Sequence, residues 1–247
     1  MKKLLLLLFP LFIQAQDVAI GHWKDYLSYN SACYIAEADN KIYCVASGGL
    51  FYVNKEDETI NRLSKVTGLS DVDVKQVAYS YELDIVIITY ENCNIDLLKN
   101  NQIINISDIK RKEITGIKSI NNITISESIV YLSTSIGLIL VDLENEEIKD
   151  TYNVGDTISM YEINGCAFLG DSIIVATPYG VYFANANNQN LADYNNWTLY
   201  AGTSGNYDNI LSSNTELFVD TSNFVTSISY NNNTLISAFS DSININN

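Results

Sequence analysis

Residues 42–53 read IYCVASGGLFYV, two apolar segments joined by a Ser-Gly-Gly turn. Related strand pairs follow at 85–97, 130–141 and 174–183. The pairs recur every 43 to 45 residues, which is typical of one four-stranded blade of a β-propeller and too long for a strand of a sandwich. The sequence therefore predicts an all-β fold, a β-propeller with about four complete blades and a partial fifth. The small-residue turns of the four copies lie at Gly49, Asn94, Gly137 and Gly180.

Short strands and turns fill each of these units, and no segment of helical period and useful length follows the N-terminus. Several inner strands are apolar on both faces, as expected where blades pack face to face. One incomplete N-terminal propeller is predicted for residues 17–247. Its blades are expected at about 31–63, 73–106, 117–152, 160–201 and 225–247.

The first sixteen residues resemble an export signal. Lys2 and Lys3 precede an apolar stretch from 4 to 13, and Ala15 stands near the expected cleavage site. The apolar run is too short to span a bilayer, so residues 1–16 are predicted to be a cleaved signal peptide, with no transmembrane segment in this chain. Export to the cell surface or the periplasm follows from this prediction.

Two similar segments surround the tryptophans. Trp23 and Trp197 lie 174 residues apart, close to four repeats, and both begin a short polar and aromatic segment. Residues 21–29 are therefore predicted to form an outer strand that clasps the last blade of the ring. Either this clasp completes a five-bladed ring, or the chain is the front part of a larger ring, which is the interpretation we favour.

Charge excludes some classes of partner. The formal charge is −15, and it becomes −17 once Lys2 and Lys3 leave with the signal. A protein binds nucleic acid by neutralising its phosphates with Lys and Arg, so the acidic balance disfavours nucleic acid and a general anionic membrane surface as partners. The one basic cluster, Lys110-Arg111-Lys112, is flanked by acids and is predicted to be a solvated loop.

The four cysteines are scattered without the spacing of a metal site. Cys33, Cys44 and Cys93 lie within or beside apolar strand segments, and burial as small hydrophobic residues is expected for them. Cys33 and Cys44 fall on neighbouring predicted strands, so they could form a disulfide in an oxidising compartment. Such cross-strand bridges are geometrically demanding, and both alternatives are kept.

The sequence contains few residues in patterns typical of a catalytic or metal-binding site. His22 is the only histidine and belongs to no triad or metal pattern, and the sequence has no nucleophile elbow or phosphate loop. Asp71 and Asp73 offer oxygens without a calcium-loop spacing. We therefore predict no catalytic, cofactor-binding or metal-binding residue and no enzyme. The acids weighed as general acids or bases are Asp71, Asp73, Glu144, Glu146 and Glu147, and a solvated face is expected for them.

Aromatic and amide residues near strand ends could provide a sugar-stacking or peptide-binding surface. Packing between blades would explain most of the same residues. The residues concerned are Tyr79, Tyr81, Tyr90, Tyr179, Tyr182, Asn92 and Asn94.

Several longer strings resemble the PorZ family of the type IX secretion system. The resemblance covers about 21–200. It implies a longer protein with two propellers and a C-terminal secretion domain. Its strings are GLSD (68–71), NIDLL (94–98), NISDIKR (105–111), ITGIKSIN (114–121), EIKDTY (147–152) and NLADYNNW (190–197).

Membership would imply a non-catalytic binding or scaffold component at the outer-membrane surface. Its partners would be the sortase that cuts the secretion signal from cargo and the anionic lipopolysaccharide to which cargo is attached. The alternative is a periplasmic ligand-sensing propeller of a two-component regulator, because the Gly-Leu-Ser-Asp turn also resembles those sensors. A propeller hydrolase or lyase is a weaker third class.

Overall fold

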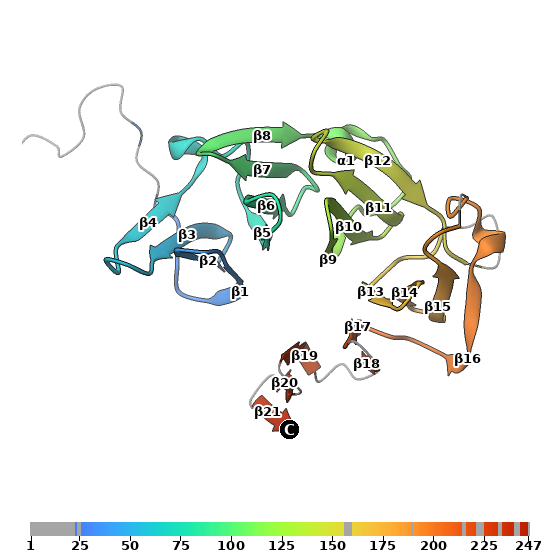
Figure 1. Ribbon diagram of the computed structural model, residues 1–247. Coiled ribbons are helices and arrows are strands. Elements are labelled where there is room, and N and C mark those ends of the chain that lie inside the picture. The colour runs from blue at the N-terminus through green and yellow to red at the C-terminus, as the bar shows by residue number, and fades with distance from the viewer. Residues whose placement is uncertain are drawn as a thin grey trace, which may run out of the picture.

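The computed structural model of the chain describes Trp23 and residues 26–155, 160–188, 190–213, 216–220, 225–231, 234–239 and 243–246. Strands predominate, and the first sixteen form four antiparallel sheets in which the strands are ordered as in the sequence. Each sheet is a blade (Figure 1), so the prediction of four-stranded propeller blades is confirmed.

The first two blades span residues 32–106. A 3-10 turn, η1 (Lys65–Thr67), follows the first blade, and a single helical turn, α1 (Asp108–Arg111), follows the second. Their strands are β1 (Ala32–Glu37), β2 (Lys41–Ala46), β3 (Gly49–Asn54), β4 (Ile60–Leu63), β5 (Val74–Ser80), β6 (Ile85–Tyr90), β7 (Ile95–Lys99) and β8 (Gln102–Ile106).

The third and fourth blades span residues 120–204. A 3-10 turn, η2 (Tyr194–Asn196), lies in the long connection before the last strand of the fourth blade. Their strands are β9 (Ile120–Ser126), β10 (Ile129–Thr134), β11 (Gly137–Asp142), β12 (Glu147–Tyr152), β13 (Gly165–Leu169), β14 (Ser172–Thr177), β15 (Gly180–Asn185) and β16 (Thr198–Ser204).

Two smaller sheets follow the fourth blade. One pairs β17 (Asn209–Ser212) with β18 (Leu217–Asp220), and the other contains β19 (Val225–Asn231), β20 (Thr234–Phe239) and β21 (Ile243–Asn246). The sequence predicts the unit that begins at 225, whereas β17 and β18 were not predicted. First strands start at 32, 74, 120, 165 and 209, so β17 continues the repeat.

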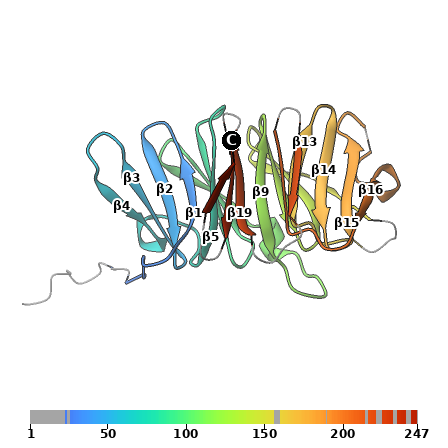
Figure 2. The same ribbon diagram turned by 90° about the horizontal axis from the view of Figure 1, so that it is seen from below.

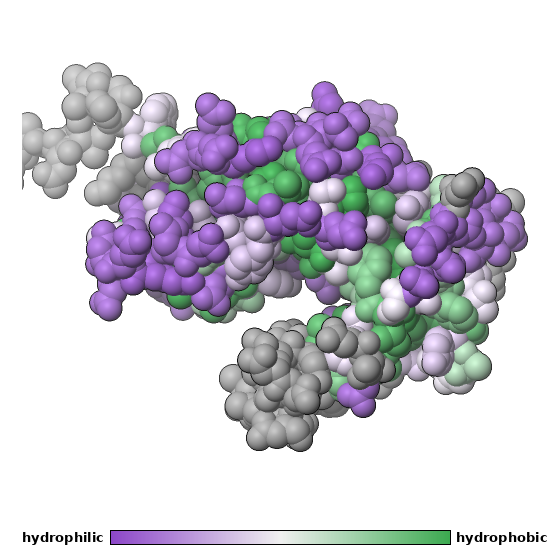
Figure 3. Space-filling model, in the orientation of Figure 1, coloured by the Kyte–Doolittle hydropathy of each residue, from purple (hydrophilic) through white to green (hydrophobic). Residues whose placement is uncertain are grey.

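The blades stand side by side in an arc. Figure 1 shows the first strands β1, β5, β9 and β13 on the inside of the arc and the fourth strands on its outside, and Figure 2 shows the blades upright from a second direction. Hydrophilic residues cover much of the outer strands, and hydrophobic residues lie between the blades and toward β13 and β14 (Figure 3).

The core consists of apolar layers between neighbouring blades. Every residue of β6 and of β11 is buried, as expected for strands covered on both faces. Val45 and Leu50 of the first blade pack with Val77 and Ile88 of the second. Burying one such side chain contributes about 1.5–3 kcal/mol, so each blade depends on its neighbour for stability.

Polar contacts between blades repeat with the sequence. Gln76 Nε2 donates to the carbonyl of Asn121 (2.8 Å), Asn121 Nδ2 to the carbonyl of Ile163 (3.0 Å), and Asn164 Nδ2 to the carbonyl of Tyr207 (2.7 Å). The partners are 45, 42 and 43 positions apart. One amide side chain, in β5, in β9 or just before β13, therefore joins each of these blades to the segment that opens the next unit.

The predicted N-terminal clasp was expected to pair with the last blade of a closed ring, and it stays a prediction. Trp23 is 83% exposed, and residues 26–30 form no strand. Tyr29 instead packs edge-on against Phe51 of the first blade (5.8 Å between ring centroids). Trp197 is buried and donates from Nε1 to the carbonyl of Leu191 (2.9 Å) in the long connection before β16. Residues 21, 22, 24 and 25 lie outside the described part.

Candidate functional site

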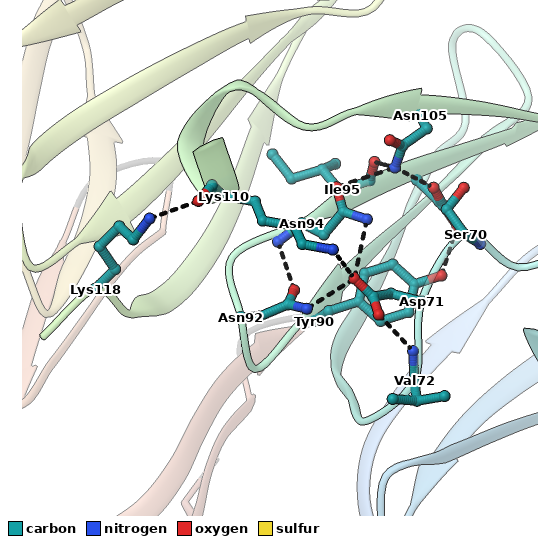
Figure 4. A network of polar contacts seen from close by, with 11 residues as sticks. Ser70, Asp71, Val72, Tyr90, Asn92, Asn94, Ile95, Asn105, Lys110 and Lys118 are labelled. Carbon is teal, nitrogen blue, oxygen red and sulfur yellow. Dashed lines mark hydrogen bonds and ion pairs between the residues drawn. The ribbon is translucent and has the colours of Figure 1, made fainter. Parts of the chain in front are cut away.

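A buried carboxylate lies where three loops meet at one end of the second blade. Asp71, in the loop between β4 and β5, is 9% exposed and accepts hydrogen bonds at Oδ2 from Asn92 Nδ2 (2.7 Å) and Asn94 Nδ2 (3.3 Å). The Nζ of Lys110 in α1 lies 2.6 Å from the same oxygen, and the Val72 N–H donates to Oδ1 (3.1 Å). Figure 4 shows these groups converging on the Asp71 carboxylate.

These contacts keep Asp71 ionised. Burial alone would raise its pKa, but the hydrogen bonds from Lys110, Asn92 and the Val72 N–H and the charge of Lys110 outweigh it, and its pKa falls to about 2. The expectation that Asp71 lies on a solvated turn is therefore wrong. Asp73, two residues later, is exposed as expected.

A second buried carboxylate extends the network. Asp96 in β7 is fully buried and accepts from the Ser70 N–H (2.8 Å), the Tyr90 hydroxyl (2.5 Å) and Asn105 Nδ2 (2.8 Å). Asn105 Nδ2 also lies 3.0 Å from Asn94 Oδ1, which joins the two carboxylates into one network. Burial and the bond to Asp96 raise the pKa of Tyr90, so this phenol stays protonated and donates.

Asn94 occupies the turn position that glycine holds in the other three copies. In the third blade Gly137 has φ 101°, and a Cβ there would approach the carbonyl oxygen of Tyr152 to 2.7 Å. The second blade has a longer turn, in which Cys93 takes the left-handed conformation (φ 62°) and Asn94 is buried. The replacement of the turn glycine by Asn94 is the one feature of the sequence that distinguishes the part of the second blade where the network lies.

The basic cluster is solvated, as the sequence predicted, but it lies on and beside a helical turn rather than in a loop. Residues 108–111 form α1, and the ammonium group of Lys118 donates to the carbonyls of Ile109 (3.1 Å), Lys110 (2.6 Å) and Lys112 (2.8 Å) at its C-terminal end. Arg111 pairs with Asp108 (3.3 Å). Because Lys110 and Arg111 pair with carboxylates, the cluster does not form an anion site.

The inner strands line an open groove of about 1370 Å³ along the inside of the arc. Its walls carry Gln76, Asn122, Thr124, Asn164 and Asn209, and no Lys, Arg or His among the described residues lines it. The amide and hydroxyl groups can bind a neutral, hydrogen-bonding ligand. They offer neither a nucleophile with an adjacent base nor a set of metal ligands.

The structure does not bring the weighed tyrosines together. Tyr90 and Tyr182 are buried, whereas Tyr81 and Tyr179 are exposed. Tyr81 lies in the β5–β6 turn and Tyr179 in the β14–β15 turn, which are at opposite ends of the blades because consecutive strands run antiparallel. Tyr79 packs against Tyr81 (4.8 Å between centroids), and Asn92 and Asn94 belong to the network around Asp71. No single stacking surface results from these residues.

The remaining acidic residues weighed in the sequence lie at the surface or in an ion pair. Glu144 and Glu147 are exposed, as expected, and Glu146 forms an ion pair with Lys99 (3.4 Å). His22 lies outside the described residues. The part of the chain that the structure describes contains no group of three or more His, Cys, Asp or Glu side chains that could hold a metal ion.

All four cysteines are free thiols. Cys33 is exposed and sits at an irregularity in the pairing of β1 with β2, opposite neither Cys44 nor another cysteine, and its Sγ donates to the carbonyl of Val45 (3.4 Å). Cys44, Cys93 and Cys166 are buried, and burial raises the pKa of each thiol. Such thiols are poor nucleophiles at neutral pH.

The protein belongs to the class of β-propellers. Its first four sheets each have four antiparallel strands with the first strand innermost, and contacts between blades recur at the repeat period. The family model described as "TSS9, PorZ, N-terminal beta-propeller domain" matches residues 42–198. The chain belongs to this PorZ family of type IX secretion components. No curated protein matches the sequence.

Solved structures support the fold. PorZ of Porphyromonas gingivalis, described as an essential bacterial surface component of the type IX secretion system, is 22% identical with a TM-score of 0.69; the match covers 92% of this chain and 28% of that chain. This chain thus spans little more than a quarter of that protein.

Two further structures share the fold at lower identity. The extracellular domain of the putative one-component system BT4673 from B. thetaiotaomicron is 12% identical (TM-score 0.56, covering 90% of this chain and 28% of that chain). The computationally designed protein Ika8 is 9% identical (TM-score 0.58, covering 88% and 84%). Across the described residues, no helix is long and apolar enough to cross a membrane.

Proposed function

We propose that this propeller is a non-catalytic binding module of the type IX secretion system. In this role it works at the outer-membrane surface with the sortase that removes the secretion signal from cargo and attaches the cargo to anionic lipopolysaccharide. The match of the PorZ propeller model to residues 42–198 is the observation that carries the proposal. The network around Asp71 supports it, because every carboxylate there is satisfied by hydrogen bonds and none is free to act as a base.

Contact with lipopolysaccharide would use its sugars. The mature chain would carry a charge of −17 after loss of the proposed signal 1–16, which opposes attraction to lipid phosphates. The groove lined by amides and hydroxyls suits neutral sugar units. Binding of the full-length protein to isolated anionic lipopolysaccharide should therefore change little between low and high salt, and a steep loss with salt would contradict sugar recognition.

Cells that lack the protein test the proposed function. Loss of the full-length protein should leave cargo with an uncleaved secretion signal and without attached lipopolysaccharide, and expression of the full-length protein should restore both. Normal cargo processing together with an altered transcriptional response to glycans would instead favour a sensor propeller of a two-component regulator. Degradation of glycans by the purified protein would favour a hydrolase or lyase.

A further inference from the structure

A pocket of about 660 Å³ lies between the first two blades, which stand side by side in Figure 1. The first blade contributes the β1–β2 turn and the beginning of β2, and the second blade contributes the β5–β6 and β7–β8 turns with the strand ends beside them. None of the residues that line the pocket lines the groove inside the arc, so the two cavities are separate. A volume between about 300 and 1,000 Å³ is typical of small-molecule sites.

The lining of the pocket combines apolar and polar side chains. Ala38, Tyr43 and Val86 are buried, and Leu98 is half-buried. The three turns add exposed amide and carboxylate groups around these residues. An apolar base with a few polar groups at its rim is the usual make-up of a site for a small ligand. The exposed polar residues are Asp39, Asn40, Asp84, Asn100 and Asn101.

Tyr43 is the residue that indicates a ligand. It lies in β2, lines the pocket and is only 3% exposed, and its hydroxyl makes no hydrogen bond with any residue in the described part of the chain. Burial, together with Tyr52 and Asp84, raises the pKa of Tyr43 to about 12, so the hydroxyl stays protonated and can donate. Buried polar groups ordinarily have a hydrogen-bond partner, and one without a partner is unfavourable. A ligand oxygen in the pocket would supply the partner.

Two carboxylates act on the same part of the pocket from opposite blades. The Tyr79 hydroxyl donates to Oδ1 of Asp84 (2.7 Å) in the second blade. Burial, this bond and the charges of Asp84 and of Asp39 in the first blade raise the pKa of Tyr79. The carboxylate of Asp39 has no hydrogen bond or ion pair with another described residue, and Oδ2 of Asp84 accepts none from them. Both groups can therefore accept hydrogen bonds from a ligand.

The cations near the pocket are already engaged. The Nζ of Lys41, the one ammonium group among the described lining residues, lies 4.9 Å from the centroid of the Tyr52 ring. Lys55 donates to the carbonyl of Asp39 (3.1 Å), but its charge is paired with Glu37 (2.6 Å). The lining thus has two carboxylates and one ammonium group, which disfavours a ligand that carries a carboxylate or phosphate.

We propose that this pocket binds a neutral sugar unit, with Tyr43 and Asp84 bonding to its hydroxyls. Each sugar hydroxyl both donates and accepts, so one ring can donate to the carboxylates of Asp39 and Asp84 and accept from the Tyr43 hydroxyl. The C–H groups of the ring can lie against the buried apolar residues. The site is additional to the groove and does not depend on the secretion role.

NMR titration of the full-length protein with glucose, galactose, mannose and N-acetylglucosamine as separate probes tests the site. We expect at least one of these sugars to bind. Tyr43→Phe should raise its Kd about two- to tenfold, because only the hydroxyl is lost. Asp84→Asn, at an exposed turn, should raise Kd about tenfold or more, because hydrogen bonds to a charged acceptor are stronger. Urea unfolding of each variant separates lost binding from lost structure.

The matched control variants lie at corresponding positions of other blades. Tyr131 is the third residue of β10, as Tyr43 is of β2, and Asp171 directly precedes β14, as Asp84 precedes β6. Tyr131→Phe and Asp171→Asn should leave Kd within about twofold. Asn122→Ala, in the groove, should do the same.

Four outcomes would overturn the pocket as a sugar site. The first is that none of the four neutral sugars binds, and the second is equal loss with Tyr43→Phe and Tyr131→Phe. The third is loss with Asn122→Ala while Tyr43→Phe and Asp84→Asn bind as wild type, which assigns the sugar to the groove. The fourth is tighter binding of glucosamine than of N-acetylglucosamine that high salt and Asp84→Asn both remove, which assigns the pocket to an ammonium group.

Discussion

The Nζ of Lys110 lies 2.6 Å from Oδ2 of Asp71, although the two residues are 39 positions apart. This ion pair joins the loop that leaves the first blade to the loop that leaves the second. Asp71→Asn should lower the free energy of unfolding by about 1–3 kcal/mol, less than for a fully buried pair because Lys110 is 41% exposed. Urea unfolding measures this change. Asp73→Asn, at an exposed neighbour, should change stability by less than about 0.5 kcal/mol, and equal effects would contradict the assigned role of Asp71.

The same carboxylate makes stability depend on pH in acid. Its pKa is about 2 in the folded protein and about 3.9 when unfolded, so its stabilising contribution is fully present above pH 4. That contribution is lost as the pH falls from about 4 through 2. Asp71→Asn should therefore flatten the stability profile in this interval. A profile identical to that of wild type would show that Asp71 is not held in its charged form.

The amide bonds between blades should matter for stability as well. Asn164→Ala removes the donor to the carbonyl of Tyr207 and should cost about 1–2 kcal/mol, measured by urea unfolding. Asn187→Ala, in an exposed turn, is the control and should be nearly neutral. If both variants unfold at the urea concentration of wild type, the repeated amides do not hold the blades together.

Turn glycines differ in what surrounds them. Gly137→Ala places a Cβ against the carbonyl of Tyr152 at positive φ, and should cost about 2–4 kcal/mol. Gly170→Ala also has positive φ (56°) but meets nothing within 4 Å, so about 1 kcal/mol is expected. Thermal unfolding compares the two. A larger loss for Gly170→Ala would contradict the close approach at Gly137.

Thiol exposure gives a chemical test of the fold. Cys33 should react with iodoacetamide in the native protein, whereas Cys44, Cys93 and Cys166 should react only after unfolding, because they are buried and burial raises the pKa of their thiols. Mass spectrometry of the labelled peptides reports each site. Rapid native labelling of Cys93 or Cys166 would contradict the packing of the second or fourth blade.

Period and turn chemistry made the blades predictable, because each copy of the strand pair forms two neighbouring strands with small residues at the turn. The pair β17 and β18 escaped prediction because its strands are four residues long and the segment 213–216 that joins them lacks the glycine present at three of the four repeated turns. The clasp at 21–29 stays a prediction, because the last blade against which it was expected to pair belongs to the larger ring that we favour.

The candidate site was harder to predict than the fold. Asp71 meets Asn92, Asn94 and Lys110, which are 21, 23 and 39 positions away in separate loops. The spacing of these residues along the chain does not predict such contacts, because the contacts depend on how neighbouring blades position their loops. The sequence shows that Asn94 replaces a turn glycine. Only the structure shows that its side chain donates a hydrogen bond to Asp71.

Cargo processing in a reconstituted mixture tests the central claim most directly. The measured quantity is the rate at which the sortase removes the secretion signal and attaches anionic lipopolysaccharide, with and without the full-length protein. We expect a faster reaction when the protein is present and no cleavage when the sortase is omitted. Cleavage of cargo by the protein alone, or a sortase rate that does not respond to it, would contradict a non-catalytic role in binding.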